Sequence, residues 1–179
     1  MLNRSIKNWL RCSSLGTLSL GWTLSATPSL ACSQNLEPEQ EIAAITAAIS
    51  EQESGDDYQA VNPESGALGR WQVLPENVIS WSQEVLGEVV STDEFLENPD
   101  IQDQIAAYKL SQYYYEALGQ TGDSWEAKRF VAAKWYSGEG SLWGDTEPQV
   151  FNGQLYPSIA EYSLEVASKA EQIEQCESL

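Results

Sequence analysis

One glutamate lies where a carboxyl group could act as a general acid. Ile42, Ile45 and Ile49 repeat at helical spacing, and the next position of the same stripe is Glu53. An ordinary glutamate has a pKa of about 4.3 and is ionised at neutral pH. A carboxyl group held against apolar side chains is desolvated, and its pKa rises. Glu53 is therefore our first candidate for acid–base catalysis, although a frayed helix end would leave it in water.

Two further acids follow closely, at Asp56 and Asp57. Glycosidases that use two carboxyl groups place the second, as nucleophile or base, about 5–9.5 Å from the first. If Asp56 or Asp57 faces Glu53 across a cleft, this two-carboxylate chemistry becomes available. Adjacent acids after a helix-ending glycine usually form a solvated loop, so we favour a loop for both.

The composition excludes several other kinds of chemistry. The 179 residues contain no histidine, which rules out a Ser-His-Asp triad, a Cys-His dyad and zinc sites built on imidazole. The chain has 9 Lys and Arg residues against 27 Asp and Glu, a formal charge of −18. Such acidity argues against a nucleic-acid partner and against electrostatic binding to an anionic membrane. We expect no metal and no cofactor.

Residues 1–31 are typical of a secretory signal peptide. A stretch of small and apolar residues, 15–30, follows a basic start formed by Arg4, Lys7 and Arg11. The stretch is too short and too rich in Ser and Thr for a membrane anchor. We expect cleavage after residue 31 and export to the periplasm or the extracellular space. The mature chain, residues 32–179, should then have no integral membrane segment.

Two cysteines remain after that cleavage, Cys32 and Cys176, near the two ends of the mature chain. In an oxidising compartment they could form one disulfide that ties the termini together. The alternative is a lipid anchor on Cys32. The four residues ending at Cys32 make a poor lipidation signal because Ser29 stands where an aliphatic residue is expected, so we favour the disulfide.

The elements that must position these residues are helices. Prolines and capping residues predict helices that start at or next to Pro38, Pro75, Ser91, Pro99, Ser124 and Tyr156. Residues 55–75 lose the helical periodicity and contain several Gly and Pro residues, so we expect a loop or small hairpin there. No repeat and no strong internal boundary appears. The sequence predicts one mainly α domain with a small irregular or hairpin segment after the first helix.

Three short motifs in order carry a resemblance to a known family. They are residues 52–55 (Gln-Glu-Ser-Gly), residues 65–72 (Ser-Gly-Ala-Leu-Gly-Arg-Trp-Gln) and residues 132–138 (Ala-Ala-Lys-Trp-Tyr-Ser-Gly). In this order they resemble the lytic transglycosylase family with the lysozyme-like SLT domain, over roughly residues 42–170. The segment 66–78 looks most similar to the branch found in phage tail and virion-associated muralytic proteins.

The resemblance implies a lysozyme-like fold and peptidoglycan glycan strands as the substrate. It implies cleavage of the MurNAc-β-1,4-GlcNAc bond by Glu53, acting first as acid and then as base, without a metal or cofactor. The acetamido group of the N-acetylmuramoyl sugar would stabilise the developing cation. The 6-hydroxyl of that sugar would then close a 1,6-anhydro ring.

Three more residues take roles from the motif match. Ser65 would bind the acetamido group or orient the acid, and Gln72 would bind the glycan. Tyr136 would point its hydroxyl at Glu53 or at the reacting sugar. Each also has a plainer role, as a turn serine, an amide that satisfies loop backbone and a core aromatic with a wet tip. Among the tryptophans, Trp143 in its Gly-rich loop is our first choice for stacking on a sugar.

Two features depart from the family pattern. Ser137 follows Tyr136 where many members have Asn, and the strong acidity is unusual for enzymes that act on an anionic wall polymer. Two alternatives stay open. One is a hydrolytic muramidase (lysozyme) of the same fold, which needs a second acid. The other is a catalytically silent glycan-binding module, in which Glu53 does no chemistry.

Overall fold

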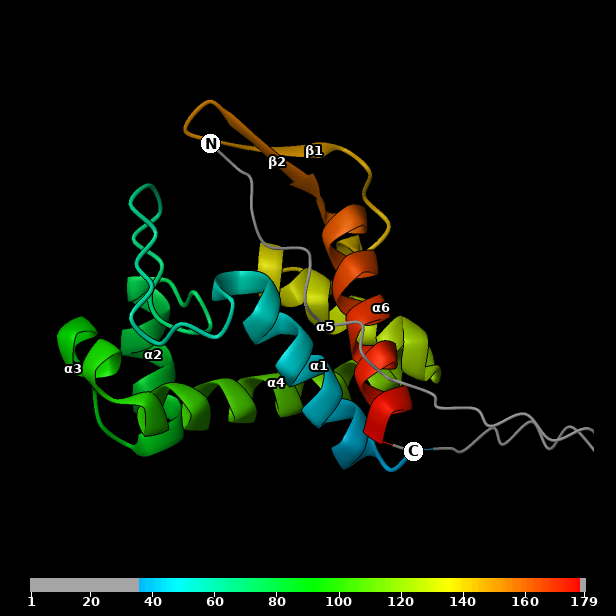
Figure 1. The fold of residues 1–179 in the computed structure, drawn as a ribbon, viewed down its shortest axis with the longest axis horizontal. Helices are drawn as coiled ribbons and strands as arrows, with labels where there is room; N and C mark the ends of the chain where they lie inside the picture. Colours follow the sequence, from blue (N-terminus) through cyan, green and yellow to red (C-terminus); the bar gives the residue numbers. More distant parts are fainter. Residues whose placement is uncertain (1–35, 178–179) are drawn as a thin grey trace, which may run out of the picture. The chain divides into compact units, whose positions relative to one another are not determined.

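The computed structural model describes residues 36–177 (Figure 1). The predicted signal peptide, its cleavage site and Cys32 lie outside these residues, so the disulfide, the lipid anchor and the export signal stay predictions. Within the described part, Cys176 is exposed near the end of the last helix. The elements in chain order are α1 (Pro38–Ser54), α2 (Pro75–Leu86), α3 (Thr92–Glu97), α4 (Pro99–Thr121), α5 (Ser124–Ser137), the short 3-10 helix η1 (Gly140–Leu142), β1 (Pro148–Phe151), β2 (Gln154–Ser158) and α6 (Ile159–Glu177).

Helix α1 carries the candidate acid and has sharply defined ends. Pro38 occupies its first turn, where the missing backbone N–H has no helical partner to lose. Gly55 ends it with a φ of 66°, in the left-handed region that glycine adopts without a steric penalty. Ile45 and Ile49 are buried, so the predicted apolar stripe faces the core. The stripe leads directly to Glu53 in the last turn.

The core lies among the long helices. Helices α5 and α6 pack against each other, α1 packs on α6, and α4 packs on α5 (Figure 1). Small residues allow the close approach, since Ala132, Ala133, Ala167 and Ala170 are all buried. The prediction of a mainly α fold is confirmed.

The hairpin lies at a place that the sequence analysis did not indicate. The segment 55–74 is irregular and contains only isolated bridges, and the regular hairpin is formed by β1 and β2 instead. Its turn is Asn152-Gly153, with φ values of 49° and 79°. Asn-Gly with Val150 and Phe151 before it and Leu155 after it is a strong hairpin signal that the sequence analysis missed. The expected start of the last helix near Tyr156 was therefore wrong, because Tyr156 pairs with Gln149 in the strand ladder.

Candidate active site

The Glu53 carboxyl group is held between two helices. Its Oε1 atom accepts a hydrogen bond from the hydroxyl of Tyr162, which is buried on α6. Burial raises the pKa of Glu53 to about 7, and the hydrogen bond from Tyr162 lowers it by less than burial raises it. A carboxyl group with this pKa is about half protonated at neutral pH, so it can donate a proton and afterwards accept one.

Glu53 opens onto a cleft of about 530 Å³, the size of a site for a small ligand or for a few sugar units. Its wall combines polar and aromatic side chains from α1, the 55–74 segment, α2, α5 and the hairpin. The lining residues are Glu53, Asn62, Ser65, Ala67, Gln72, Val73, Leu74, Asn77, Trp81, Trp135, Tyr136, Ser137, Gln149, Val150, Phe151 and Tyr156. Among these described residues Glu53 is the only carboxylic acid.

Tyr136 lies beside the acid without binding it. Its ring stacks on that of Tyr162 with centroids 4.3 Å apart and planes 10° from parallel. Its hydroxyl donates to the backbone carbonyl of Pro157 at 3.0 Å, at the base of the hairpin. Burial raises the pKa of Tyr136, and the nearby Glu53 adds to the shift. Tyr162, and not Tyr136, therefore forms the direct hydrogen bond to Glu53. Tyr136 lies on the wall of the cleft.

Ser65 and Gln72 both line the cleft, and both also hold the loop that carries them. The Ser65 hydroxyl oxygen accepts the backbone N–H of Ala67 at 3.2 Å, as a turn serine does. Gln72 has a positive φ of 47°, and its side-chain amide donates to the carbonyl of Gly69 at 3.0 Å. Their places on the wall fit a glycan-binding role, and their hydrogen bonds fit the structural role as well.

Asp56 and Asp57 point to other partners. Asp56 forms an ion pair with Arg70 at 2.8 Å and accepts the Ser50 hydroxyl at 2.7 Å. Asp57 accepts the backbone N–H of Gln59 at 2.9 Å, which is the solvated-loop arrangement. Neither residue lines the cleft. The geometry therefore provides no second carboxylate facing Glu53 from this pair.

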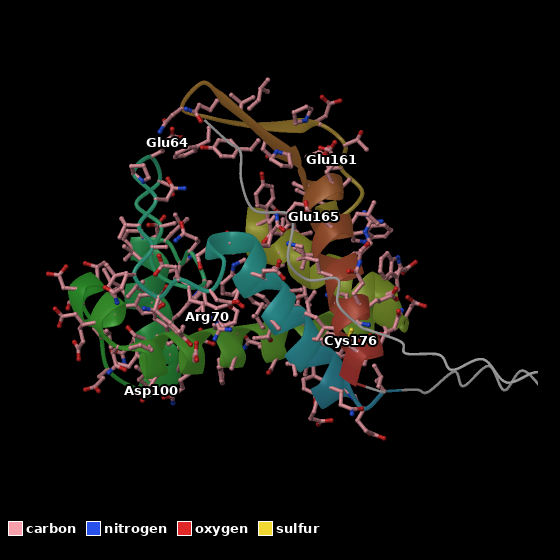
Figure 2. The ribbon with its side chains drawn as sticks, viewed as in Figure 1. Glu64, Arg70, Asp100, Glu161, Glu165 and Cys176 are labelled. Carbon is pink, nitrogen blue, oxygen red and sulfur yellow. The ribbon has the colours of Figure 1, made fainter. Side chains whose placement is uncertain are left out.

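A partly buried polar cluster that the sequence analysis missed fixes the loop beside α1. The backbone carbonyl of Arg70 accepts the Ser54 hydroxyl at 2.8 Å, and the Arg70 backbone N–H donates to Gln102 at 2.9 Å. The Arg70 side chain, labelled in Figure 2, also forms an ion pair with Asp103 at 3.3 Å. At Gly69, with a φ of 70°, a Cβ atom would lie 2.1 Å from the Gln102 side-chain oxygen. The glycine is thus required for this close contact.

The aromatic wall differs from the expectation. Trp81 and Trp135 line the cleft with ring centroids 5.5 Å apart. The ring of Trp143 instead stacks under the guanidinium group of Arg129 at 4.5 Å, and Trp143 is not part of the cleft lining. The geometry therefore favours Trp81 and Trp135 over Trp143 as the sugar platform, and stacking on Trp143 stays a prediction.

No group of three or more Cys, Asp or Glu residues within the described range is arranged to hold a metal ion. Among the helices described, none has the length and apolar character needed to cross a bilayer.

Comparison with known proteins gives one match. The family model for the transglycosylase SLT domain matches residues 32–143, which include all three motifs and the candidate acid. No curated protein and no solved structure matches the chain. The matched residues end before the hairpin and α6, so Tyr162 and Tyr156 lie outside them. The match covers more than half of the sequence, and the chain belongs to the SLT transglycosylase family, whose lysozyme-like, mainly α domains are lytic transglycosylases of peptidoglycan.

Proposed function

We propose that this protein is a peptidoglycan lytic transglycosylase that cleaves the MurNAc-β-1,4-GlcNAc bond and leaves a 1,6-anhydroMurNAc end. The observation that carries the proposal is Glu53, whose carboxyl group has a pKa of about 7 and is the only carboxylic acid of the cleft lining. A single acid of this kind suits a reaction in which the substrate supplies the second functional group.

The reaction needs only groups that the cleft and the substrate provide. Protonated Glu53 donates its proton to the glycosidic oxygen, and the bond to C1 of the muramoyl sugar breaks. The acetamido oxygen of that sugar bonds to C1 and carries the charge as an oxazolinium ion. The Glu53 carboxylate then removes the proton of the 6-hydroxyl, and O6 attacks C1 as the acetamido bond opens. Glu53 ends protonated and ready for the next cycle.

The neighbours of Glu53 support both halves of this cycle. The Tyr162 hydroxyl donates to Glu53 Oε1 and so stabilises the carboxylate that forms after proton transfer. Desolvation acts in the opposite sense and keeps the protonated form available. Ser65 and Gln72 stand on the wall where they would bind the sugar. Ser137, which stands where many members of the family have Asn, also lines the cleft, and its hydroxyl donates to the backbone carbonyl of Ala133 at 2.8 Å.

We also propose that the protein acts outside the cytoplasm. The support is the basic start and the stretch of small and apolar residues within 1–31, together with a substrate that lies outside the cytoplasmic membrane. Edman sequencing of the exported protein should begin at Cys32. A mature protein that still carries residues 1–31 would contradict this proposal.

The function is tested by mass spectrometry of products from purified peptidoglycan. We expect fragments that end in 1,6-anhydro sugars, and Glu53→Gln should lower their rate of formation by about 10²- to 10⁴-fold, the usual contribution of a general acid–base group. Glu51→Gln is the matched control, since Glu51 is exposed on the same helix two residues earlier. Reducing ends in place of anhydro ends would show a hydrolase, and no cleavage at all would indicate a silent binding module.

A further inference from the structure

A single side-chain hydrogen bond joins the two rims of the cleft. The hydroxyl of Tyr156, on strand β2, donates to Glu64 Oε2 at 2.7 Å. Figure 2 shows Glu64 at the tip of the 55–74 segment, on the side of the hairpin. Tyr156 itself lines the cleft, whereas Glu64 does not. We call this hydrogen bond the Glu64–Tyr156 clasp.

Local hydrogen bonds position the segments that carry the two partners of the clasp. On one side, Asn62 accepts the backbone N–H groups of Glu64 at 2.9 Å and of Ser65 at 3.2 Å, which fixes the turn. On the other side, the base of the hairpin is held by the Tyr136 hydroxyl at the carbonyl of Pro157. Both partners are therefore in place before any ligand binds.

Away from its base, the hairpin has little other support. Val150 is 68% exposed and Leu155 is 76% exposed. Within the described residues, the clasp is the one side-chain hydrogen bond that the structure records between the hairpin and the 55–74 segment. The carboxylate of Glu64 raises the pKa of Tyr156, so the phenol keeps the proton that it donates. The clasp is thus a local contact that can open while the core stays folded.

We propose that the Glu64–Tyr156 clasp closes the cleft over the bound glycan strand and makes the protein cut preferentially near strand ends, an inference that rests on the proposed function. A polymer can enter a cleft that is bridged from rim to rim only by threading from a free end. An internal segment of a strand can enter only when the bridge is open. The frequency of internal cuts therefore follows the fraction of molecules in which the clasp is broken.

The test breaks the clasp separately from each side. Tyr156→Phe removes the donor and keeps the ring on the cleft wall, while Glu64→Ala removes the acceptor without changing a lining residue. Tyr115→Phe is the matched control, because the exposed Tyr115 hydroxyl also bonds a glutamate, Glu39, at 3.2 Å and is not part of the cleft lining. The substrate is a set of long, uncrosslinked glycan strands, digested until about a tenth of the bonds are cut.

The length of the products tests the proposal about the clasp. The chemical nature of the new ends, anhydro or reducing, tests the proposed function. The wild type should release mainly short fragments from strand ends. Tyr156→Phe and Glu64→Ala should each raise the share of internal cuts about fivefold, because each removes the hydrogen bond that joins the two rims. Tyr115→Phe should match the wild type. Rates on a short soluble oligosaccharide, which needs no threading, should change little in Glu64→Ala and Tyr115→Phe, because neither residue lines the cleft.

The outcomes separate the two ideas. Equal length profiles for the wild type and both clasp variants would overturn the clasp, whichever ends are formed. Reducing ends with the predicted change in length would overturn the lyase chemistry and support the clasp. A wild type that cuts at random along the strand would overturn the clasp, and one that cuts nothing would overturn both ideas.

Discussion

Two glutamates at opposite ends of helix α1, Glu41 and Glu53, have opposite electrostatic surroundings. Glu41, in its first turn, accepts a hydrogen bond from the hydroxyl of Tyr114 on α4. Glu53, in its last turn, accepts one from the hydroxyl of Tyr162 on α6. Both carboxyl groups are partly buried. A tyrosine partner and partial burial are therefore not enough to distinguish a candidate acid from a structural one.

The difference lies in the charges nearby. Glu41 is 4.0 Å from the ammonium group of Lys128, which also pairs with Glu174 at 2.7 Å, and Glu41 accepts the Ser124 hydroxyl at 2.5 Å. It also lies at the positive end of the helix dipole. Glu53 lies at the negative end, and no Lys or Arg of the described residues forms an ion pair with it. Glu41 has a nearby cation that stabilises its carboxylate, so its role is structural. Glu53 is buried without such a cation, so it can hold and donate a proton.

The largest expected effect on stability is at the end of α1 that carries Glu41. Lys128→Met would leave Glu41 and Glu174 buried together without their cation. Breaking a buried ion pair by removing one partner costs about 3–5 kcal/mol, and we expect a loss of that size in the free energy of unfolding. Urea unfolding of the mature chain at pH 7 measures it.

The control for this change is Lys169→Met. Lys169 lies 3.8 Å from Glu51 and 3.9 Å from Glu165, and both of those side chains are more than half exposed. Exposed ion pairs contribute little, so this variant should change stability by no more than about 1 kcal/mol. Equal losses of unfolding free energy in the two variants would mean that Lys128 does not specifically stabilise the carboxylates of Glu41 and Glu174.

At the end of α1 that carries Glu53, urea unfolding should show a gain in the free energy of unfolding when the glutamate is replaced. The pKa of Glu53 rises from 4.5 to about 7 on folding, so the folded chain holds a proton that the unfolded chain releases in that range. Stability therefore falls as the pH rises from 4.5 to 7 and stays lower above 7. Glu53→Gln removes this penalty, and at pH 8 it should stabilise the protein by about 3 kcal/mol.

The pH dependence distinguishes this effect from an unspecific one. The gain from Glu53→Gln should shrink as the pH falls and vanish near pH 4.5, where Glu53 is protonated in the folded chain. Glu51→Gln, on the exposed face of the same helix, should give no comparable gain. A stabilisation by Glu53→Gln that is the same at pH 4.5 and pH 8 would contradict the raised pKa.

Local signals were enough to place the acid. The isoleucine stripe of α1 and the helix-ending Gly55 predicted Glu53 in the last turn of an apolar helix, and the structure has it there. Helix starts at Pro75 and Pro99 were predicted for the same reason, since a proline in a first turn is a local feature. These features depend on neighbours within a few residues, so one sequence can show them.

The partners of the acid could not be predicted in this way. Tyr162 shares a helical face with Ile159 and Val166, and all three side chains are buried. Its hydroxyl meets Glu53 only because α6 packs on α1, which no local pattern reveals. The same holds for Gln102, which supports the loop at Arg70 from α4. Contacts between residues far apart in sequence need the packed structure.

The smallest expected effect concerns the pH at which activity falls. The acid must be protonated in the free enzyme, so kcat/KM should fall tenfold per pH unit above about pH 7, the pKa of Glu53. The Tyr162 hydroxyl favours the carboxylate, so Tyr162→Phe should raise that pKa further. We expect the alkaline limb of the profile to move upward by about one pH unit, whatever happens to the maximal rate.

Tyr136→Phe provides the matched comparison, because the two rings stack and the substitution is the same. The Tyr136 hydroxyl bonds the carbonyl of Pro157 and not the acid, so its removal can lower the rate but should leave the midpoint of the limb in place. Initial rates on soluble glycan strands between pH 5 and 9 give both quantities. An equal shift in the two variants, or none in Tyr162→Phe, would mean that the hydrogen bond to Glu53 does not set its pKa and that the charges around α1 act alone.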